Sequence, residues 1–357
     1  MKRIPILVLA ALVLVACVDR KYSVTVELPV GVIEDGQIFQ LINYDHDEVI
    51  DSVAAVNNRL CFEGKVVKPY AVAMKSPMGG YLPFVLEPGE ILIDSMGTIS
   101  GTPSNEAMLA MKAEMNAVRS DATLTREEKS LRMTDLLDST FEANKENAVG
   151  YFLFLDIMGQ KDKAELDSLL KVLPTMYSNS VLVTNRVNFL TQLELTAEGQ
   201  PFVDFTLKAE DGSEQKLSDY VGRGEYVLVD FWASWCGPCR REMPTVKEIF
   251  TKYKDQGLKV LGVAVNDEVS DAQKAIEEMG IEWPVIFDVQ GTSLNVYGVS
   301  GIPHLILFAP DGTIVSRGAR GDDLKAVVDA AMNGKELTIV IQKGRAHCGR
   351  DLFICSF

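Results

Sequence analysis

Two cysteines, Cys236 and Cys239, are separated by only two residues. The apolar run 226–232 before them is typical of a buried strand, and residues 240–253 carry apolar side chains at helical spacing. A strand, a tight turn and a helix would put Cys236 at a helix N-terminus, where unpaired N–H groups and the helix dipole favour a thiolate. Two thiols on one helical turn can also close a disulfide. The sequence therefore predicts a redox site that cycles between dithiol and disulfide.

A C-x-x-C pair can also be one half of a zinc site. Zinc would need a second pair of ligands, and Cys61, Cys348 and Cys355 are neither close in sequence nor suitably spaced. We therefore expect no metal at the pair, and no cofactor.

The residues on both sides of Cys236 and Cys239 carry further sequence motifs. Residues 231–244, FWASWCGPCRREMP, resemble the membrane-tethered TlpA/ResA branch of the thioredoxin superfamily. The segment 301–304 lies where that family keeps a cis-proline loop facing the cysteines. The resemblance covers roughly residues 198–336. It implies a thioredoxin-like α/β domain and a thiol-disulfide oxidoreductase that acts on disulfide-containing partner proteins.

The resemblance also implies roles for four residues. Cys236 would be the exposed nucleophile, and Cys239 would resolve the mixed disulfide from a shielded position. Asp230 interrupts the apolar strand, where burial should raise the pKa of its carboxyl, and thioredoxins keep a proton acceptor at this spacing. Glu242 matches an active-site acid of the ResA branch. The alternative for Glu242 is a solvated first-turn acid that favours the helix dipole.

A substrate groove is expected beside the cysteines. If the peptide bond before Pro303 is cis, nearby backbone stays free to pair with an extended substrate segment. His304 either lines this groove or is an exposed loop histidine. The predicted groove residues are Trp235, Gly237, Pro238, Ile302, Pro303 and His304.

The N-terminus predicts export and a lipid anchor. A short basic start precedes the apolar stretch 4–15, which is too short for a transmembrane helix and is typical of an export signal. Residues 14–17, LVAC, match the bacterial lipobox, which implies a lipidated Cys17 at the mature N-terminus. The protein would then be held at a membrane of the cell envelope, periplasmic or outer-membrane associated. The alternative is an ordinary cleaved signal.

Length and charge limit the remaining possibilities. A chain of 357 residues has room for two or three domains, and a net charge of −15 argues against binding nucleic acid. We expect a signal peptide (1–16), a β-rich domain (17–103), a helical connector (104–196), a thioredoxin-like domain (197–336) and a tail (337–357).

The segment before the thioredoxin-like domain predicts strands and then helices. Residues 24–28, 37–42 and 70–74 are strand candidates, and 81–94 suggests a hairpin. The order resembles the β-domain of unknown function that precedes thioredoxin modules in Gram-negative lipoproteins. We interpret the acidic run 45–48 as a solvated turn rather than a metal site, and Cys61 as a small buried residue.

The expected connector shows a capping box at Thr125 and Glu128, and a second helix start at 162–165. The methionines at 108, 111 and 115 share one helical face, which favours core packing over copper binding. In the last domain, a closing hairpin is predicted around the turn 310–312.

The predicted function is reduction of disulfides in partner proteins, with electrons supplied by a membrane reductase. A thioredoxin-fold peroxidase is an alternative, although the Thr-x-x-Cys setting of peroxiredoxins does not occur here. A second alternative is a ligand- or protein-binding lipoprotein in which the thioredoxin-like module only regulates.

Overall fold

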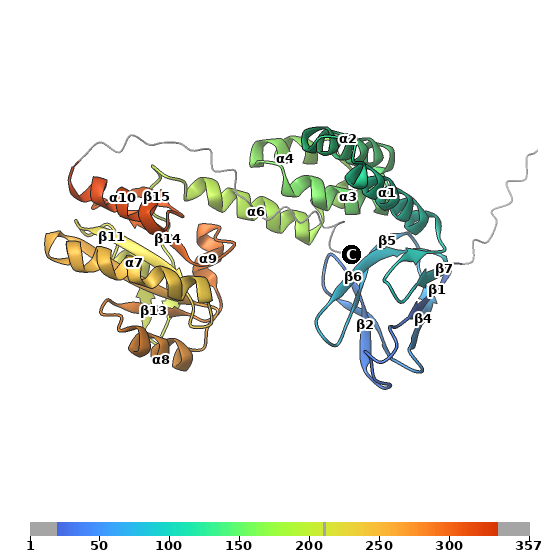
Figure 1. The fold of residues 1–357 in the computed structure, drawn as a ribbon, viewed down its shortest axis with the longest axis horizontal. Coiled ribbons are helices and arrows are strands. Elements are labelled where there is room, and N and C mark those ends of the chain that lie inside the picture. The colour runs from blue at the N-terminus through green and yellow to red at the C-terminus, as the bar shows by residue number, and fades with distance from the viewer. Residues whose placement is uncertain (1–19, 210–211, 335–357) are drawn as a thin grey trace, which may run out of the picture. The chain divides into compact units, whose positions relative to one another are not determined.

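The computed structural model describes residues 20–209 and 212–334 (Figure 1). The predicted signal, Cys17, and the tail with Cys348 and Cys355 lie outside the described residues. The described chain forms two compact units. The first unit contains residues 20–161 and 168–184, and the second contains 162–167, 185–209 and 212–334. The division cuts two helices, α4 (Lys163–Leu170) and α6 (Val181–Leu195).

The first unit contains two four-stranded sheets, in the orders β4-β1-β7-β8 and β3-β2-β5-β6. Inward side chains of both sheets share one apolar core, because alternate residues of each strand point to the same face. The strands are β1 (Lys21–Glu27), β2 (Ile38–Asn43), β3 (Val49–Ala54), β4 (Arg59–Lys65), β5 (Tyr70–Lys75), β6 (Tyr81–Leu86), β7 (Gly89–Ile93) and β8 (Ile99–Ser100).

The hairpin predicted over 81–94 is wrong. β6 pairs with β5, whereas β7 runs parallel to β1 in the other sheet and pairs with β8. Pro88 cannot donate a ladder hydrogen bond, and Gly89 adopts a φ of 126°, a conformation that glycine tolerates best. The chain therefore changes sheets at these two residues instead of turning back on itself.

Cys61 is exposed, so the prediction of a buried thiol is wrong. It lies on β4, where the burial alternates from residue to residue. The neighbours Leu60 and Phe62 point into the core, which forces the side chain between them outward.

The prediction of a solvated turn at 45–48 is also wrong for Asp45. Its carboxylate accepts hydrogen bonds from Tyr151 Oη at 2.7 Å and Ser180 Oγ at 2.6 Å. It also accepts the backbone N–H groups of Val181 and Leu182, at 3.0 and 3.1 Å, in the first turn of α6. Because the first N–H groups of a helix lack partners within it, Asp45 caps this helix from a distant loop.

The helices of the first unit are α1 (Pro103–Ser120), α2 (Arg126–Asn144), α3 (Ala148–Gly159) and α5 (Thr175–Ser178). The capping box that opens α2 is confirmed, because Thr125 and Glu128 exchange side-chain and backbone hydrogen bonds. Met111 and Met115 of α1 are buried, as core packing predicts. The short helix α4 (Lys163–Leu170) follows a reciprocal pair of bonds between Asp162 and Glu165, which confirms the second predicted start.

The second unit is built on a five-stranded sheet of order β13-β12-β11-β14-β15. β11 runs parallel to β12 and antiparallel to β14, and the predicted hairpin of β14 and β15 is confirmed. A small hairpin of β9 and β10 precedes the sheet. The strands are β9 (Thr206–Lys208), β10 (Glu214–Lys216), β11 (Tyr226–Trp232), β12 (Leu258–Val265), β13 (Val285–Asp288), β14 (His304–Phe308) and β15 (Ile314–Arg317).

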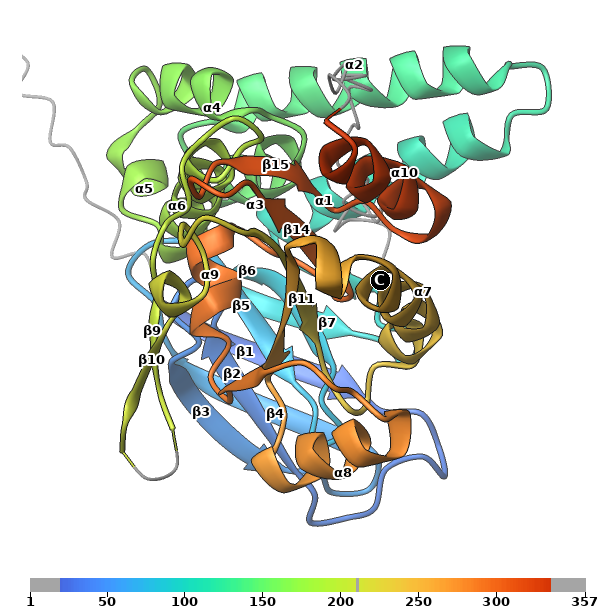
Figure 2. The same ribbon diagram turned by 90° about the vertical axis from the view of Figure 1, so that its left-hand side faces the viewer.

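Helices cover both faces of this sheet. α7 (Gly237–Tyr253), α8 (Val269–Met279) and α10 (Gly321–Met332) supply buried residues to the core on one face. α9 (Thr292–Tyr297) supplies the core on the other face, together with Phe205, Leu207, Leu217 and Val221. Figure 2 shows α7 and α10 on one side of β11 and β14, with α9 on the other. The predicted fold class, a thioredoxin-like domain after a β-rich region and helices, is confirmed.

Candidate active site

The two cysteines lie where the buried central strand gives way to a helix. β11 ends at Trp232, and α7 begins at Gly237 with Cys236 as its N-cap residue. Pro238 fits the first turn because the N–H that it lacks would have no partner inside the helix. Cys236 and Cys239 form a disulfide with their Cα atoms 5.3 Å apart, and the backbone N–H of Cys239 donates to Cys236 Sγ at 3.1 Å.

Cys236 is only 3% exposed in this disulfide form, so the expectation of an exposed sulfur is wrong for the oxidised protein. The carbonyl oxygen of Ile302 lies 3.8 Å from Cys236 Sγ, and Ile302 packs against the same apolar core. Trp235, in contrast, is 64% exposed. The exposed side chain next to the buried Cys236 is therefore that of Trp235.

The predicted loop does lie against the cysteines. The peptide bond between Ile302 and Pro303 is cis, and Pro303 is buried. His304 starts β14 and pairs in register with Phe231 of β11. The loop that contains Pro303 is therefore held in place by β14, which pairs with β11, the strand that leads to the cysteines.

A second loop fixes the residues that lead into Cys236. Asp267 accepts hydrogen bonds from the backbone N–H of Ser234 and from Ser234 Oγ, the latter at 2.9 Å. Trp235 Nε1 donates to the carbonyl oxygen of Asn266 at 3.0 Å, and Arg240 Nε donates to that of Ser234 at 2.9 Å. The sequence analysis did not predict these hydrogen bonds. The available signal was the pair of polar residues, Asn266 and Asp267, directly after the apolar strand β12.

Asp230 is 3% exposed and its Oδ1 atom has no hydrogen-bond partner. Burial, together with the nearby charge of Glu242, raises the pKa of its carboxyl to about 7, while the charge of Arg320 acts in the opposite direction. A carboxyl with a pKa near 7 can take up and release a proton under neutral conditions.

Glu242 is not the solvated acid of the alternative prediction. It is half-buried, and its Oε1 accepts the backbone N–H of Gly321 at 2.7 Å. Gly321 begins α10, so the carboxylate lies at the N-terminus of a second helix, where a negative charge is favoured. Arg320, the N-cap of α10, is the residue whose charge opposes the raised pKa of Asp230.

His304 is not an exposed loop histidine. Burial lowers its pKa to about 4, with the charges of Arg317 and Arg320 acting in the same direction. Its Nε2 atom is buried without a hydrogen-bond partner. The imidazole is therefore neutral at pH 7, and this strand position carries no positive charge from the histidine.

Two arginines of α7, Arg240 and Arg241, follow the cysteine pair and carry positive charge. Arg240 forms an ion pair with Glu278 at 3.3 Å, which offsets its charge. Arg241 Nη1 lies 3.6 Å from the place where a Cβ on Gly237 would be. The Arg241 side chain is exposed, however, so water screens its charge.

Within residues 20–209 and 212–334, no group of three or more histidine, cysteine or acidic side chains is placed to hold a metal ion. In the same ranges, no helix has the length and apolar character needed to cross a membrane.

Comparisons with known proteins agree on the second unit. Residues 199–317 match the AhpC/TSA family, and residues 22–108 match a domain of unknown function, DUF4369. Thiol-disulfide oxidoreductase ResA of Geobacillus thermodenitrificans is 37% identical over 127 residues, which are 36% of this chain and 72% of the relative. The same oxidoreductase of Bacillus subtilis is 31% identical over 34% of this chain and 67% of the relative.

Solved structures include the thioredoxin domain of a thiol-disulfide oxidoreductase from Bacteroides vulgatus, which is 35% identical with a TM-score of 0.34. That alignment covers 37% of this chain and 96% of the other. The extent of the ResA alignment, together with the fold around Cys236 and Cys239, establishes the family. The chain belongs to the ResA-like thiol-disulfide oxidoreductases of the thioredoxin superfamily.

Proposed function

We propose that the protein reduces disulfide bonds in partner proteins, with Cys236 as the attacking thiol and Cys239 as the resolving thiol. The observation that supports this most directly is the position of Cys236 as N-cap of α7, with the N–H of Cys239 donated to its sulfur. In the reduced protein, that donor and the helix dipole favour the Cys236 thiolate, which is the reactive form of the thiol.

The reaction has two exchange steps. The Cys236 thiolate attacks one sulfur of the partner disulfide, so that a mixed disulfide forms and the other partner sulfur leaves and takes up a proton. Cys239 then loses its proton and attacks Cys236 Sγ, which releases the second partner thiol. Two electrons pass to the partner, and this protein ends as the Cys236–Cys239 disulfide. A reductase in the membrane then supplies two electrons to restore the dithiol.

Asp230 serves as acceptor for the Cys239 proton in the second step, and Glu242 tunes it. The pKa of about 7 supports this role, because such a carboxyl is partly ionised when the proton must leave. The exposed indole of Trp235 and the backbone at Ile302 and Pro303 provide the surface for an extended partner segment.

The site of action is the cell envelope outside the cytosol, with the protein held by lipid on Cys17. The basis is the sequence of residues 1–17 alone. Intact mass of the protein from its native membrane tests this: acylated Cys17 at the N-terminus is expected, and cleavage elsewhere or an unmodified Cys17 would refute it.

The activity is tested with two substrates in parallel. Reduced protein is expected to reduce insulin disulfides, and Cys236→Ser should lower the rate at least about a thousandfold. Hydrogen peroxide consumption should be slow by comparison. Fast peroxide consumption that depends on Cys236, with no insulin reduction, would favour the peroxidase instead.

A further inference from the structure

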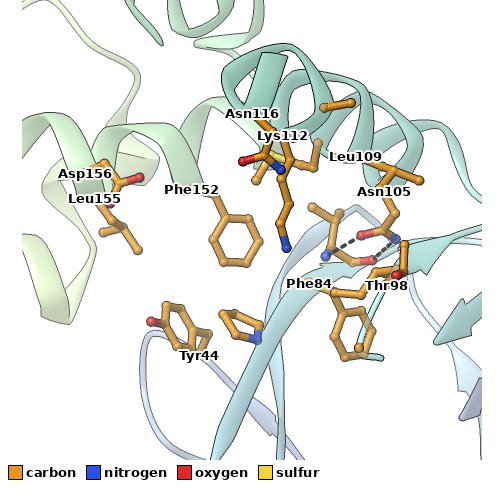
Figure 3. Close-up of a pocket in the computed structure, with 16 residues that line it drawn as sticks. Tyr44, Phe84, Thr98, Asn105, Leu109, Lys112, Asn116, Phe152, Leu155 and Asp156 are labelled. Atoms are coloured by element: carbon orange, nitrogen blue, oxygen red, sulfur yellow. Dashed lines mark hydrogen bonds between the residues drawn. The ribbon is translucent and has the colours of Figure 1, made fainter. Parts of the chain in front are cut away.

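The first unit contains a pocket of about 260 Å³ that is lined in part by α1 and α3 (Figure 3). Its charged lining residues, Lys112 and Asp156, already take part in interactions within the protein, so neither charge is free for a ligand. The pocket belongs to the first unit, whereas the redox site belongs to the second. Selection of disulfide partners depends instead on the surface of the second unit around Cys236.

Few large apolar side chains of the second unit are exposed. Within its described residues, 162–167, 185–209 and 212–334, three are: Leu195, Trp235 at 64% and Val289 at 47%. Trp235 directly precedes Cys236, and Val289 directly follows β13. Apolar side chains that are exposed together beside a site mark a surface that binds another molecule.

Trp235 and Val289 lie at the same edge of the central sheet. β11, β12 and β13 are parallel neighbours, so their carboxyl ends meet at one edge. Trp235 lies in the loop after β11, and Val289 lies in the loop after β13. Because neighbouring strands are ~4.8 Å apart, two strand spacings place these loops about 10 Å apart. Three residues of extended chain cover about that distance, so one short peptide segment can reach both side chains.

The loop after β12 connects the two others. Trp235 Nε1 donates to the carbonyl oxygen of Asn266 at 3.0 Å, and the N–H of Asn266 donates to the carbonyl oxygen of Asp288 at 3.0 Å. The Oδ1 atom of Asn266 lies 2.6 Å from the place where a Cβ on Gly291 would be, so this close approach requires glycine. Asn266 therefore joins the loop of Trp235 to the loop of Val289.

The loop that carries Val289 is fixed at both of its ends. Asp288, which is 2% exposed, accepts the backbone N–H groups of Thr292 at 2.9 Å and of Ser293 at 2.6 Å. These bonds tie the end of β13 to the start of α9, with Val289 between them. A surface that is already ordered loses less conformational entropy when a partner docks on it.

The buried carboxylates at this edge are occupied by hydrogen bonds within the protein. Asp267 holds Ser234, and Asp288 holds the first turn of α9. The exposed neighbour of Val289, Gln290, is uncharged. What this edge offers beside Cys236 is therefore apolar contact.

We propose that Trp235 and Val289 together bind an apolar side chain of the partner protein, about three residues away from its reactive cysteine. Disulfides in such a sequence setting are then reduced faster than disulfides in a polar one. The inference rests on the proposed reduction of partner disulfides and adds which partners are preferred. Val289 binds the partner and takes no part in the exchange of sulfurs.

The probes are two peptide disulfides and one small disulfide. Each peptide is a disulfide-linked dimer of a short Ser/Gly sequence with one cysteine, and it carries either Leu or Ser about three positions away on both sides. Hydroxyethyl disulfide has no side chain for this edge to bind. The reduced protein should react at least about fivefold faster with the Leu peptide than with the Ser peptide.

Val289→Ser should lower the rate for the Leu peptide at least about threefold. The rates for the Ser peptide and for hydroxyethyl disulfide should not change, a split that a merely structural role of Val289 would not produce. Val289→Leu should keep the fast rate for the Leu peptide. Circular dichroism checks that each variant is folded.

Leu195→Ser is the matched control, because Leu195 is exposed at the end of α6 and lies on none of these loops. It should change none of the three rates. The inference is overturned if the Leu and Ser peptides react equally fast, if Val289→Ser slows all three disulfides alike, or if it behaves as Leu195→Ser does. If the unchanged protein reduces none of the three disulfides, the proposed reductase function fails, and the inference fails with it.

Discussion

Two aspartates, one in each unit, meet opposite surroundings. Asp45 of the first unit is half-buried. Burial alone would raise its pKa, but hydrogen bonds from Ser180, Tyr151 and the α6 backbone outweigh that effect and lower it. Asp230 of the second unit is fully buried, its Oδ1 atom has no hydrogen-bond partner, and its pKa rises to about 7.

The difference separates an acid that holds distant segments together from one whose proposed role is proton transfer. A carboxylate whose oxygens are occupied by donors stays ionised and joins segments that are distant in sequence. A carboxyl that is buried without donors costs stability when it ionises, and such groups gather at sites that move protons. The first unit uses Asp45 to hold a helix, whereas the second keeps Asp230 beside its redox helix.

The largest effect is expected from Asp230→Asn. Because the pKa of Asp230 in the folded protein is raised from 3.8 to about 7, the folded state binds this proton more tightly than the unfolded state does. The stability of the oxidised protein should therefore fall as pH rises from about 4 to 7. At pH 8, the free energy of unfolding of Asp230→Asn should be about 2–4 kcal/mol higher than that of the unchanged protein. At pH 4, the two proteins should have equal free energies of unfolding.

The same variant should slow resolution of the mixed disulfide at pH 7 about a hundredfold, because the proton acceptor is lost. Urea unfolding at several pH values and single-turnover kinetics measure the two effects. If Asp230→Asn and the unchanged protein have the same free energy of unfolding at pH 8, ionised Asp230 does not destabilise the folded protein. The contrast with Asp45 would then be wrong.

Asp45→Ala should act on structure alone. The change leaves the N–H groups of Val181 and Leu182 and two hydroxyl groups without their acceptor, which should cost about 2–3 kcal/mol in the first unit. Amide hydrogen exchange in the first turn of α6 should accelerate, while insulin reduction per folded molecule stays the same. Glu48→Ala, at an exposed neighbouring position, is the matched control. Unchanged exchange would show that the cap contributes nothing.

Asp267→Ala tests a hydrogen-bonded aspartate that belongs to the second unit. Asp267, like Asp45, accepts hydrogen bonds from a distant segment, here two from Ser234, but this segment leads directly into Cys236. Release of Ser234 should lower the insulin reduction rate about tenfold, since a less fixed nucleophile reaches the productive geometry less often. Asp271→Ala, on the exposed side of α8, should leave the rate unchanged. If Asp267→Ala and Asp271→Ala reduce insulin at the same rate, the hydrogen bonds between Asp267 and Ser234 do not contribute to the reaction.

Cys61→Ser should have the smallest effect. Its thiol lies on the outer face of β4, where its Sγ is 3.8 Å from Glu63 Oε1. The free energy of unfolding should change by less than about 0.5 kcal/mol, and insulin reduction should not change. In the oxidised protein, iodoacetamide should label Cys61, whereas Cys236 is tied in the disulfide. A loss of activity in Cys61→Ser would place this thiol in the redox cycle.

The second unit was largely predictable because its signals are local. The apolar run of β11, the Gly-Pro turn and the helical spacing of α7 lie next to one another, and each supports the same strand, turn and helix. The raised pKa of Asp230 also followed from one acidic residue in an apolar strand.

What could not be predicted depends on contacts between distant segments. β6 and β7 are adjacent in sequence but belong to different sheets, and no local pattern shows which strand each will pair with. Asp45 looked solvated because its partners lie more than a hundred residues away. Cys61 was predicted to be buried because it lies between two apolar residues. Side chains alternate between the two faces of β4, and this alternation points Cys61 outward.

The direction of electron flow is the central claim, and the reduction potential of the Cys236–Cys239 pair tests it most directly. Neither Gly237 nor Pro238 adds a positive charge, and His304 is neutral at pH 7. Arg240 is paired with Glu278, and the charge of Arg241, which lies near Gly237, is screened by water because its side chain is exposed. The thiolate should therefore be only moderately stabilised.

Equilibration with glutathione at known ratios, followed by alkylation and mass analysis, should give a midpoint near that of thioredoxin, about −270 mV. A midpoint near about −120 mV, typical of a dedicated disulfide-forming enzyme, would contradict the account.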